Sequence, residues 1–223
     1  MTLVSTPKRL IFEPGSVDYI PNFSANLYTA PGAGPTIITK ITVHNSDGSP
    51  QDLTMWIGGT TDADLILPTT SIPAGEEFVD DAIRIIPAGV EFYAQASASN
   101  SLSIAMEGIE ITGTPDALEA FPTRLFKGSV PNGGGVVYTP GADQTGVIHT
   151  ITLVNIDASP RTVDVYSEFS ASGRYYRRTI AAGERAVIPG VHFLQFGADL
   201  SMTTDDTDVV VAIVDGAVID ASP

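Results

Sequence analysis

The sequence contains no cysteine among its 223 residues. This absence excludes a disulfide framework, a thiolate nucleophile and any zinc site with cysteine ligands. It also agrees with synthesis in a reducing compartment. Charged residues are scarce, at 17% of the chain, whereas hydrophobic residues reach 43% and mean hydropathy is +0.17. This composition is typical of a folded chain with a substantial core and not of a disordered one.

Positive charge is also scarce. The chain has 11 lysine and arginine residues against 26 aspartate and glutamate residues, so its formal net charge is −15. Because nucleic acids and anionic membranes repel such a chain, we expect neither as a partner. The longest apolar run near the C-terminus, residues 209–214, is far shorter than the ~20 residues of a membrane helix. Residues 1–12 lack the apolar region of a signal peptide, so we expect none.

The chain does contain an internal repeat. The matching segments are residues 27–32 and 137–141, 37–45 and 147–155, 72–76 and 180–184, 86–92 and 188–193, and 107–108 and 215–216. The offset is 110 at Tyr28 and 108 at Gly108. Five matches in the same order predict two tandem copies of one domain, residues 1–114 and 115–223, each of a common domain size.

Within each copy, apolar residues recur with a period of two. Ile37, Ile41 and Val43 fall on one face of a strand, and Lys40 and His44 fall on the other. Similar candidate strands are residues 102–106, 150–154, 162–166 and 209–214. Turn signals rich in proline, glycine, asparagine and aspartate separate them. The sequence therefore predicts an all-β protein of two tandem antiparallel β-sandwich domains, with jelly-roll and immunoglobulin-like strand orders both open.

Candidate catalytic residues are hard to find. The repeat aligns the three histidines with other residue types: His44 with Val154, His149 with Thr39, and His192 with Glu91. No pair of histidines has the spacing of metal ligands. The G-x-S-x-G pattern of a nucleophile elbow does not occur. We therefore expect a protein that is not an enzyme, with no catalytic residues, no cofactor and no metal site.

Carboxylates gather in three segments, residues 62–64, 76–81 and 205–208. Such loops supply the oxygen ligands that Ca²⁺ prefers. None of them matches the EF-hand loop, and loop carboxylates are usually solvated turn residues. Calcium binding at these loops stays open at this point.

One segment departs from the acidic background, and its members are Arg174, Tyr175, Tyr176, Arg177 and Arg178. Its counterpart in the first copy, residues 66–70, is uncharged. Arginine and tyrosine are enriched at protein interfaces and also stack on nucleic-acid bases. In a chain this acidic, we expect a contact with an acidic protein surface, such as a neighbouring copy. A strand whose arginines simply face solvent is an equal alternative, and nucleic-acid binding ranks third.

A sequence of strand and turn segments carries a family resemblance. These segments are residues 28–31, 37–45, 52–57, 72–76, 88–90, 94–98 and 106–108. Together they resemble small β-sandwich structural proteins of tailed bacteriophages, and the second copy repeats the pattern more loosely, with residues 94–98 reduced to 196–199. The resemblance implies no catalytic residues. It implies capsid decoration or a neck or tail accessory role, homo-oligomers bound to capsid, neck or tail proteins, and a place on a virion assembled in the bacterial cytoplasm.

The sequence thus favours a non-enzymatic structural protein of a virion. The alternative is a carbohydrate-binding or host-adhesion module, because tandem β-sandwiches often serve that class. Sugar sites need exposed aromatic side chains, and the candidates are Trp56, Tyr93, Tyr175 and Tyr176. Trp56 lies in an alternating strand, where we expect it to be part of the core.

Overall fold

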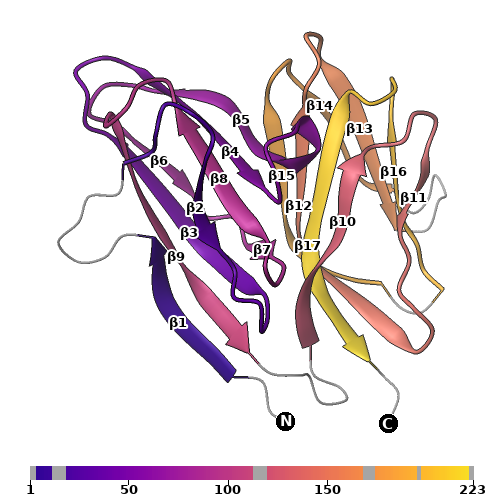
Figure 1. The fold of residues 1–223 in the computed structure, drawn as a ribbon. Helices are drawn as coiled ribbons and strands as arrows, with labels where there is room; N and C mark the ends of the chain where they lie inside the picture. The colour runs from indigo at the N-terminus through magenta and orange to yellow at the C-terminus, as the bar shows by residue number, and fades with distance from the viewer. Residues whose placement is uncertain (1–3, 12–18, 113–119, 168–173, 195–196, 221–223) are drawn as a thin grey trace. The chain divides into compact units, whose positions relative to one another are not determined.

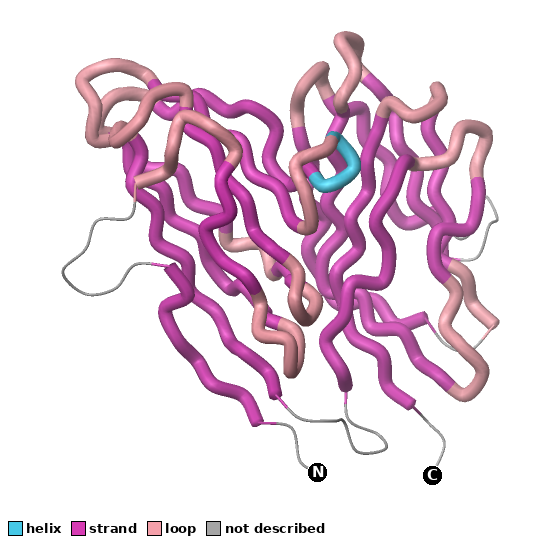
Figure 2. The backbone as a smooth tube through the Cα atoms, in the orientation of Figure 1, coloured by secondary structure: helices cyan, strands magenta, loops and turns pink. Residues whose placement is uncertain are grey.

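The computed structural model describes residues 4–11, 19–112, 120–167, 174–194 and 197–220. These residues form antiparallel β-sheets, and the helical turn η1 (Asp62–Asp64) is the single helical segment among them (Figures 1 and 2). The prediction of an all-β protein is confirmed. Contacts along the chain divide it into two compact units, Thr2–Thr114 and Pro115–Pro223.

The first unit holds two sheets. One contains, in spatial order, β1 (Val4–Ile11), β9 (Leu102–Thr112), β3 (Thr36–Asn45) and β6 (Glu77–Asp80), and β7 (Arg84–Ile86) also pairs with β3. The other contains β2 (Ala25–Thr29), β8 (Glu91–Ala96), β4 (Gln51–Ile57) and β5 (Leu65–Ile72). Both sheets supply buried apolar side chains, such as Ile41 and Met106 from the first and Met55 and Phe92 from the second.

The second unit also holds two sheets. One contains β10 (Ala120–Ser129), β17 (Val210–Asp220), β12 (Gln144–Asn155) and β15 (Arg185–Leu194). The other contains β11 (Gly135–Tyr138), β16 (Leu200–Thr204), β13 (Arg161–Ser167) and β14 (Arg174–Ile180). A single hydrophobic cluster takes side chains from both sheets, for example Ile151 and Val214 from one and Val163 and Met202 from the other. Burial of this cluster is the main stabilising term available to the unit.

The two units share one order of strands. Reading along the chain, β1 to β5 correspond to β10 to β14, β15 spans the counterparts of β6 and β7, and β8 and β9 correspond to β16 and β17. The register agrees as well, because Ile41 pairs with Met106 as Ile151 pairs with Val214. An irregularity interrupts the pairing of β3 with β9 and of β12 with β17 at matching positions.

Because of that irregularity, the predicted assignment of side chains to the two faces of β3 is wrong for the first part of the strand. Strict alternation placed Ile37 with Ile41 and Val43. In the structure Ile38 is buried together with Ile41 and Val43, because a register shift between Ile38 and Lys40 moves the first part of the strand by one position. An extra residue in one strand reverses the face on which each preceding side chain lies.

The strand register also corrects one part of the sequence repeat, because the match of residues 86–92 with 188–193 is wrong. Ile86 pairs with Thr36 as Leu194 pairs with Gly146, so Ile86 corresponds to Leu194. The offset is therefore 108 without a gap, and Gly89 and Gly197 both adopt a positive φ, 72° and 83°.

The same register reassigns His192. It corresponds to Arg84 and not to Glu91, because His192 pairs with Ile148 as Arg84 pairs with Ile38. The Pro-Gly pair at residues 189–190 is the reason that residues 188–193 were matched to residues 86–92. It resembles a turn, but Pro189 lies inside β15 and pairs with Thr150.

Candidate interaction surface

The strand β14 carries the arginines singled out in the sequence, and we refer to it as the arginine strand. It is the last strand of its sheet and pairs, among the described strands, with β13 alone. The side chains of Arg174 and Arg177 are 42% and 59% exposed, and Arg178 is also exposed. The sheet edge therefore presents three cationic groups, and no described strand pairs with its outer side.

Asp164 on β13 lies opposite the arginine strand. It pairs with Arg177 across the two strands, and its Oδ1 atom is 3.7 Å from Arg177 Nε and 3.5 Å from the nearer Arg174 nitrogen. Oδ1 is buried and has no hydrogen-bond partner among the described residues. Both distances exceed the 2.7–3.2 Å typical of a hydrogen bond. The two guanidinium groups thus lie near one carboxylate without being bound tightly to it.

Tyr176 differs from its arginine neighbours. Its side chain packs against the hydrophobic cluster, opposite Val165, and its hydroxyl is buried without a hydrogen-bond partner among the described residues. Tyr176 therefore anchors the arginine strand to the core of the unit. The side chain of Tyr175 lies outside the described part of the structure.

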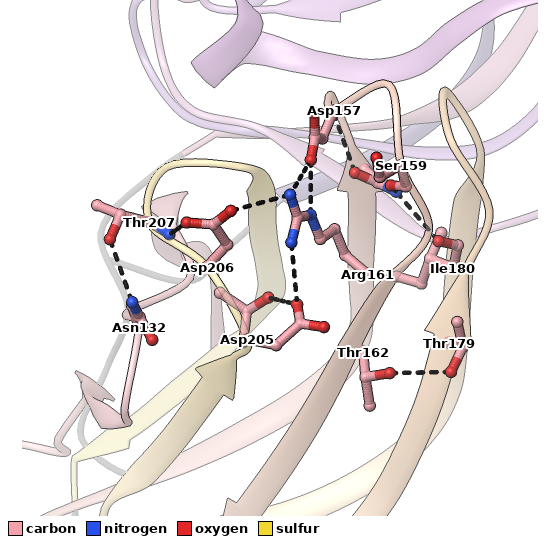
Figure 3. Close-up of polar contacts among 12 residues, drawn as sticks. Asn132, Asp157, Ser159, Arg161, Thr162, Thr179, Ile180, Asp205, Asp206 and Thr207 are labelled. Atoms are coloured by element: carbon pink, nitrogen blue, oxygen red, sulfur yellow. Dashed lines mark hydrogen bonds and ion pairs between the residues drawn. The ribbon is translucent and has the colours of Figure 1, made fainter.

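A second ionic group lies at the beginning of β13, and Figure 3 shows Arg161 directed toward three aspartates from two loops. Arg161 donates to Asp157 Oδ2 from Nε at 2.6 Å and also from a terminal nitrogen. It makes a 2.9 Å ion pair with Asp206 and a longer one, 4.0 Å, with Asp205. Sequence reasoning missed this network, although Asp157 and Arg161 stand at the same spacing as Asp47 and Gln51 in the first copy.

The network changes the acidity of its members. Hydrogen bonding from Arg161, and then from the Ala158 amide, holds the pKa of Asp157 below its usual value. The hydrogen bond to Asp157 raises the pKa of Arg161, so the guanidinium is charged at every accessible pH. The loops after β12 and β16 are thereby joined to the first residue of β13.

The first unit has no arginine at the matching positions, although Asp47 keeps the carboxylate that corresponds to Asp157. Gln51 stands where Arg161 stands, donates to Asp47 at 3.1 Å and accepts from Ser97 at 2.7 Å. The counterparts of Asp164 and Arg177 are Thr54 and Thr69, whose hydroxyls lie 3.0 Å apart. Both ionic arrangements are therefore specific to the second unit.

Between the two ionic groups lies an open hollow of about 330 Å³. Its lining residues are Thr162, Asp164, Arg177, Thr203, Thr204 and Asp205. They offer hydroxyl, carboxylate and guanidinium groups to a ligand, and no aromatic side chain is among them. Such a surface can accept and donate hydrogen bonds to polar groups of a partner.

Two carboxylates from the other candidate segments, Asp64 and Asp80, accept hydrogen bonds within the first unit. Asp64 accepts hydrogen bonds from the Thr61 amide and hydroxyl at 3.3 and 2.5 Å, which caps η1. Asp80 accepts 2.9 and 3.3 Å hydrogen bonds from the fully buried Arg84. Trp56 is buried at 8% exposure, as expected.

The described residues contain no group of three or more histidine, aspartate or glutamate side chains that could hold a metal ion. His44 has a buried Nδ1 atom without a hydrogen-bond partner in the described chain. His149 lies in β12, and His192 lies in β15 beside Ile148. No helix within the described ranges is long and apolar enough to cross a membrane.

Comparison with known proteins gives structural likenesses only. No family model matches the chain, and no curated protein matches it. The major capsid protein P2 of bacteriophage PM2 has a TM-score of 0.40 and 12% identity over 98% of each chain. N-glycanase F (PNGase F) has a TM-score of 0.38 and 12% identity over 100% of this chain and 97% of its own.

A third similar structure is the N-terminal CBM22-1-CBM22-2 tandem domain of Paenibacillus barcinonensis Xyn10C. Its TM-score is 0.28, with 10% identity over 97% of this chain and 92% of its own. The similar structures thus include a phage capsid protein, an enzyme and a pair of carbohydrate-binding modules. At these TM-scores none of them assigns a function, which has to be argued from the chain's own residues.

Proposed function

We propose that this protein is a non-enzymatic structural component of a tailed-phage virion, acting as a capsid decoration or as a neck or tail accessory protein. Its partners are the capsid, neck or tail proteins and further copies of itself. The observation that carries the proposal is the strand order that the two units share. The first unit has the sheets β1-β9-β3-β6 and β2-β8-β4-β5, and the second unit has the sheets β10-β17-β12-β15 and β11-β16-β13-β14.

This strand order supports a finer description of the fold as two tandem jelly-roll sandwiches, residues 1–114 and 115–223. A jelly roll has eight strands in two sheets. The described part of the second unit has eight strands, and in both units the chain passes to the other sheet at each step except β4 to β5, β6 to β7 and β13 to β14. An immunoglobulin-like order places consecutive strands differently. Jelly rolls occur in viral capsids and in lectin-type domains, which are the two classes that the sequence favours.

The arginine strand supports assembly over a solitary protein. Exposed cationic groups at a sheet edge, in a chain with a net charge of −15, provide a surface complementary to acidic partners. Edge strands are themselves templates for pairing between chains. The surface consists of Arg174, Arg177 and Arg178, and Tyr176 anchors the strand by packing against the hydrophobic cluster.

Localisation on purified particles tests the proposal. Antibody-gold labelling should place the protein over the head, which assigns a decoration role, or at one vertex or the tail, which assigns a neck or tail role. Absence of the protein from washed particles would overturn the proposal. A matched label against a known capsid protein checks that the particles are intact and accessible to antibody.

The second candidate is a carbohydrate-binding or host-adhesion module, and the open hollow beside Asp164 and Arg177 favours it. Sugar hydroxyls pair well with carboxylate and guanidinium groups, although the hollow lacks the aromatic surface on which sugars stack. Glycan-array binding that is lost in Asp164→Thr/Arg177→Thr and retained in Thr54→Ala would support this function. Binding lost in Tyr175→Ala and retained in Asp164→Thr/Arg177→Thr would place a sugar site elsewhere on the arginine strand.

A further inference from the structure

Two sheet edges carry more exposed charge than ion pairs within the described residues neutralise. On the arginine strand, Arg178 makes no hydrogen bond or ion pair with a described residue, and Arg174 and Arg177 share the single carboxylate of Asp164. Counted over the described residues, the strand therefore has an excess of positive charge.

One sheet edge of the first unit carries an excess of negative charge instead. β6 is the last strand of its sheet, and Glu76, Glu77 and Asp81 on and beside it are all exposed. Their carboxylates make no hydrogen bond or ion pair with any residue in the described part of the chain. We call these three residues the acidic edge.

We propose that the arginine strand of one copy docks on the acidic edge of a second copy. This inference rests on the proposed assembly function and names the partner of its interaction surface. Charge complementarity selects the occupant, because three arginines meet three carboxylates. The two surfaces also have similar lengths, since the arginines lie within residues 174–178 and the carboxylates within 76–81.

The same charges exclude the alternative pairings. Two arginine strands repel each other, and so do two acidic edges, so neither edge can pair with its own copy in a symmetric dimer. The favoured contact joins different surfaces on the two copies. Such a head-to-tail contact closes into a ring or continues as an array, which is the geometry that a shell, neck or tail component needs.

Charge reversal provides a sharp test. The double variants Arg177→Glu/Arg178→Glu and Glu76→Lys/Glu77→Lys should each weaken self-association at least about tenfold in sedimentation analysis at 50 mM NaCl. Combining all four changes in one chain, or mixing the two double variants, should restore association, because complementary edges then face each other again. Raising NaCl to 500 mM should weaken the wild-type association by about tenfold or more.

Three controls keep the result interpretable. Arg177→Thr/Arg178→Thr installs the residues found at the matching positions of the first unit, Thr69 and Thr70, and should also weaken association while the chain stays folded. Glu184→Lys changes the position that matches Glu76 in the second unit and should leave association unchanged. Circular dichroism and thermal unfolding report whether each variant is folded.

A wild-type chain that stays monomeric at millimolar concentration and low salt overturns the inference. So does failure of the combined reversal to restore association when both double variants are folded. These outcomes are separate from particle localisation: a particle-bound but monomeric protein keeps the proposed function and loses the docking contact. A self-associating protein absent from particles keeps the contact and loses the function.

Discussion

Asn45 and Asn155 make the same set of hydrogen bonds, 110 positions apart in the chain. The Asn45 amide donates to the carbonyl oxygens of Ser49, Ile72 and Pro73 at 2.9, 2.9 and 3.1 Å, and its oxygen accepts from the Asp47 amide. The Asn155 amide donates to those of Ser159, Ile180 and Ala181 at 2.8, 3.0 and 3.1 Å, and its oxygen accepts from the Asp157 amide. Each side chain thus joins the end of one strand to the turn that follows another.

Replacing either asparagine by alanine should destabilise its unit by about 3 kcal/mol, because three carbonyl oxygens lose this side-chain donor and the bond to Ile72 or Ile180 is buried. Both asparagines are fully buried. Asparagine-to-aspartate variants should be destabilised as well, since a carboxylate cannot donate to carbonyl oxygens. Urea unfolding, followed by far-UV circular dichroism, measures the change. Asn132→Ala is the control: Asn132 is exposed, and its side chain donates to the Thr207 hydroxyl at 3.3 Å, so its loss should cost about 0.5 kcal/mol or less.

Gly108 and Gly216 are the second matched pair, and alanine at either should destabilise the chain by about 3 kcal/mol or more. A β-carbon at Gly108 would lie 2.3 Å from the carbonyl oxygen of Ile37, and one at Gly216 would lie 2.1 Å from that of Val147. Backbone atoms cannot move aside without breaking the strand pairing beside them. Thermal unfolding measures the effect.

Gly48→Ala is the matched control for this pair, because a β-carbon there meets nothing within 4 Å and its φ is not positive. It should leave the melting temperature nearly unchanged. Equal stability of Gly48→Ala and Gly216→Ala would contradict the close approach of the two backbones at Gly216.

Much of the strand pattern could be predicted from alternation alone. The candidate segments 102–106, 150–154 and 162–166 all lie inside observed strands. The strand order could not be predicted, because it depends on which edges meet in space and not on local periodicity. The bulge between Ile38 and Lys40 could not be predicted either, because it shifts the strand register without changing the apolar composition of β3.

The candidate surface was predicted less completely. The arginine cluster stands out in the sequence, but the inward position of Tyr176 depends on its pairing with Val165. The network at Arg161 brings Asp157 and Asp206 together from loops about fifty positions apart, so spacing alone could reveal only one of its ion pairs.

The threonine pair of the first unit suggests a test of how much the ionic surface contributes to stability. Asp164→Thr/Arg177→Thr should unfold within about 1 kcal/mol of the wild type, because a 3.7 Å ion pair with an exposed arginine contributes little and threonine suits a strand. Thr54 and Thr69 already occupy these positions with hydroxyls 3.0 Å apart. A double-mutant cycle in urea should give a coupling energy below about 1 kcal/mol. A loss above about 2 kcal/mol in the double variant would show that the ion pairs are needed to keep β14 in place.

The Arg161–Asp157 pair should make the acid stability of the second unit depend on one arginine. Because Arg161 lowers the pKa of folded Asp157, the folded state holds fewer protons than the unfolded state at acidic pH. The stabilisation is therefore present above the ordinary aspartate pKa of about 4, and it is lost as pH falls through the lower folded value. Arg161→Gln, which installs the residue found in the first unit, should flatten this loss.

The measurement is the urea midpoint of wild type and Arg161→Gln between pH 2 and pH 7, with residue-resolved hydrogen exchange in β13 to report on the second unit. The two midpoint curves should converge at the acid end, where Asp157 is protonated in both chains, and separate toward neutral pH. Arg178→Gln makes the same chemical change at an exposed arginine without an ion pair to any described residue, and its curve should follow the wild type. Parallel curves for wild type and Arg161→Gln over the whole range would mean that Asp157 keeps its low pKa without Arg161, leaving the Ala158 amide as the dominant hydrogen-bond donor.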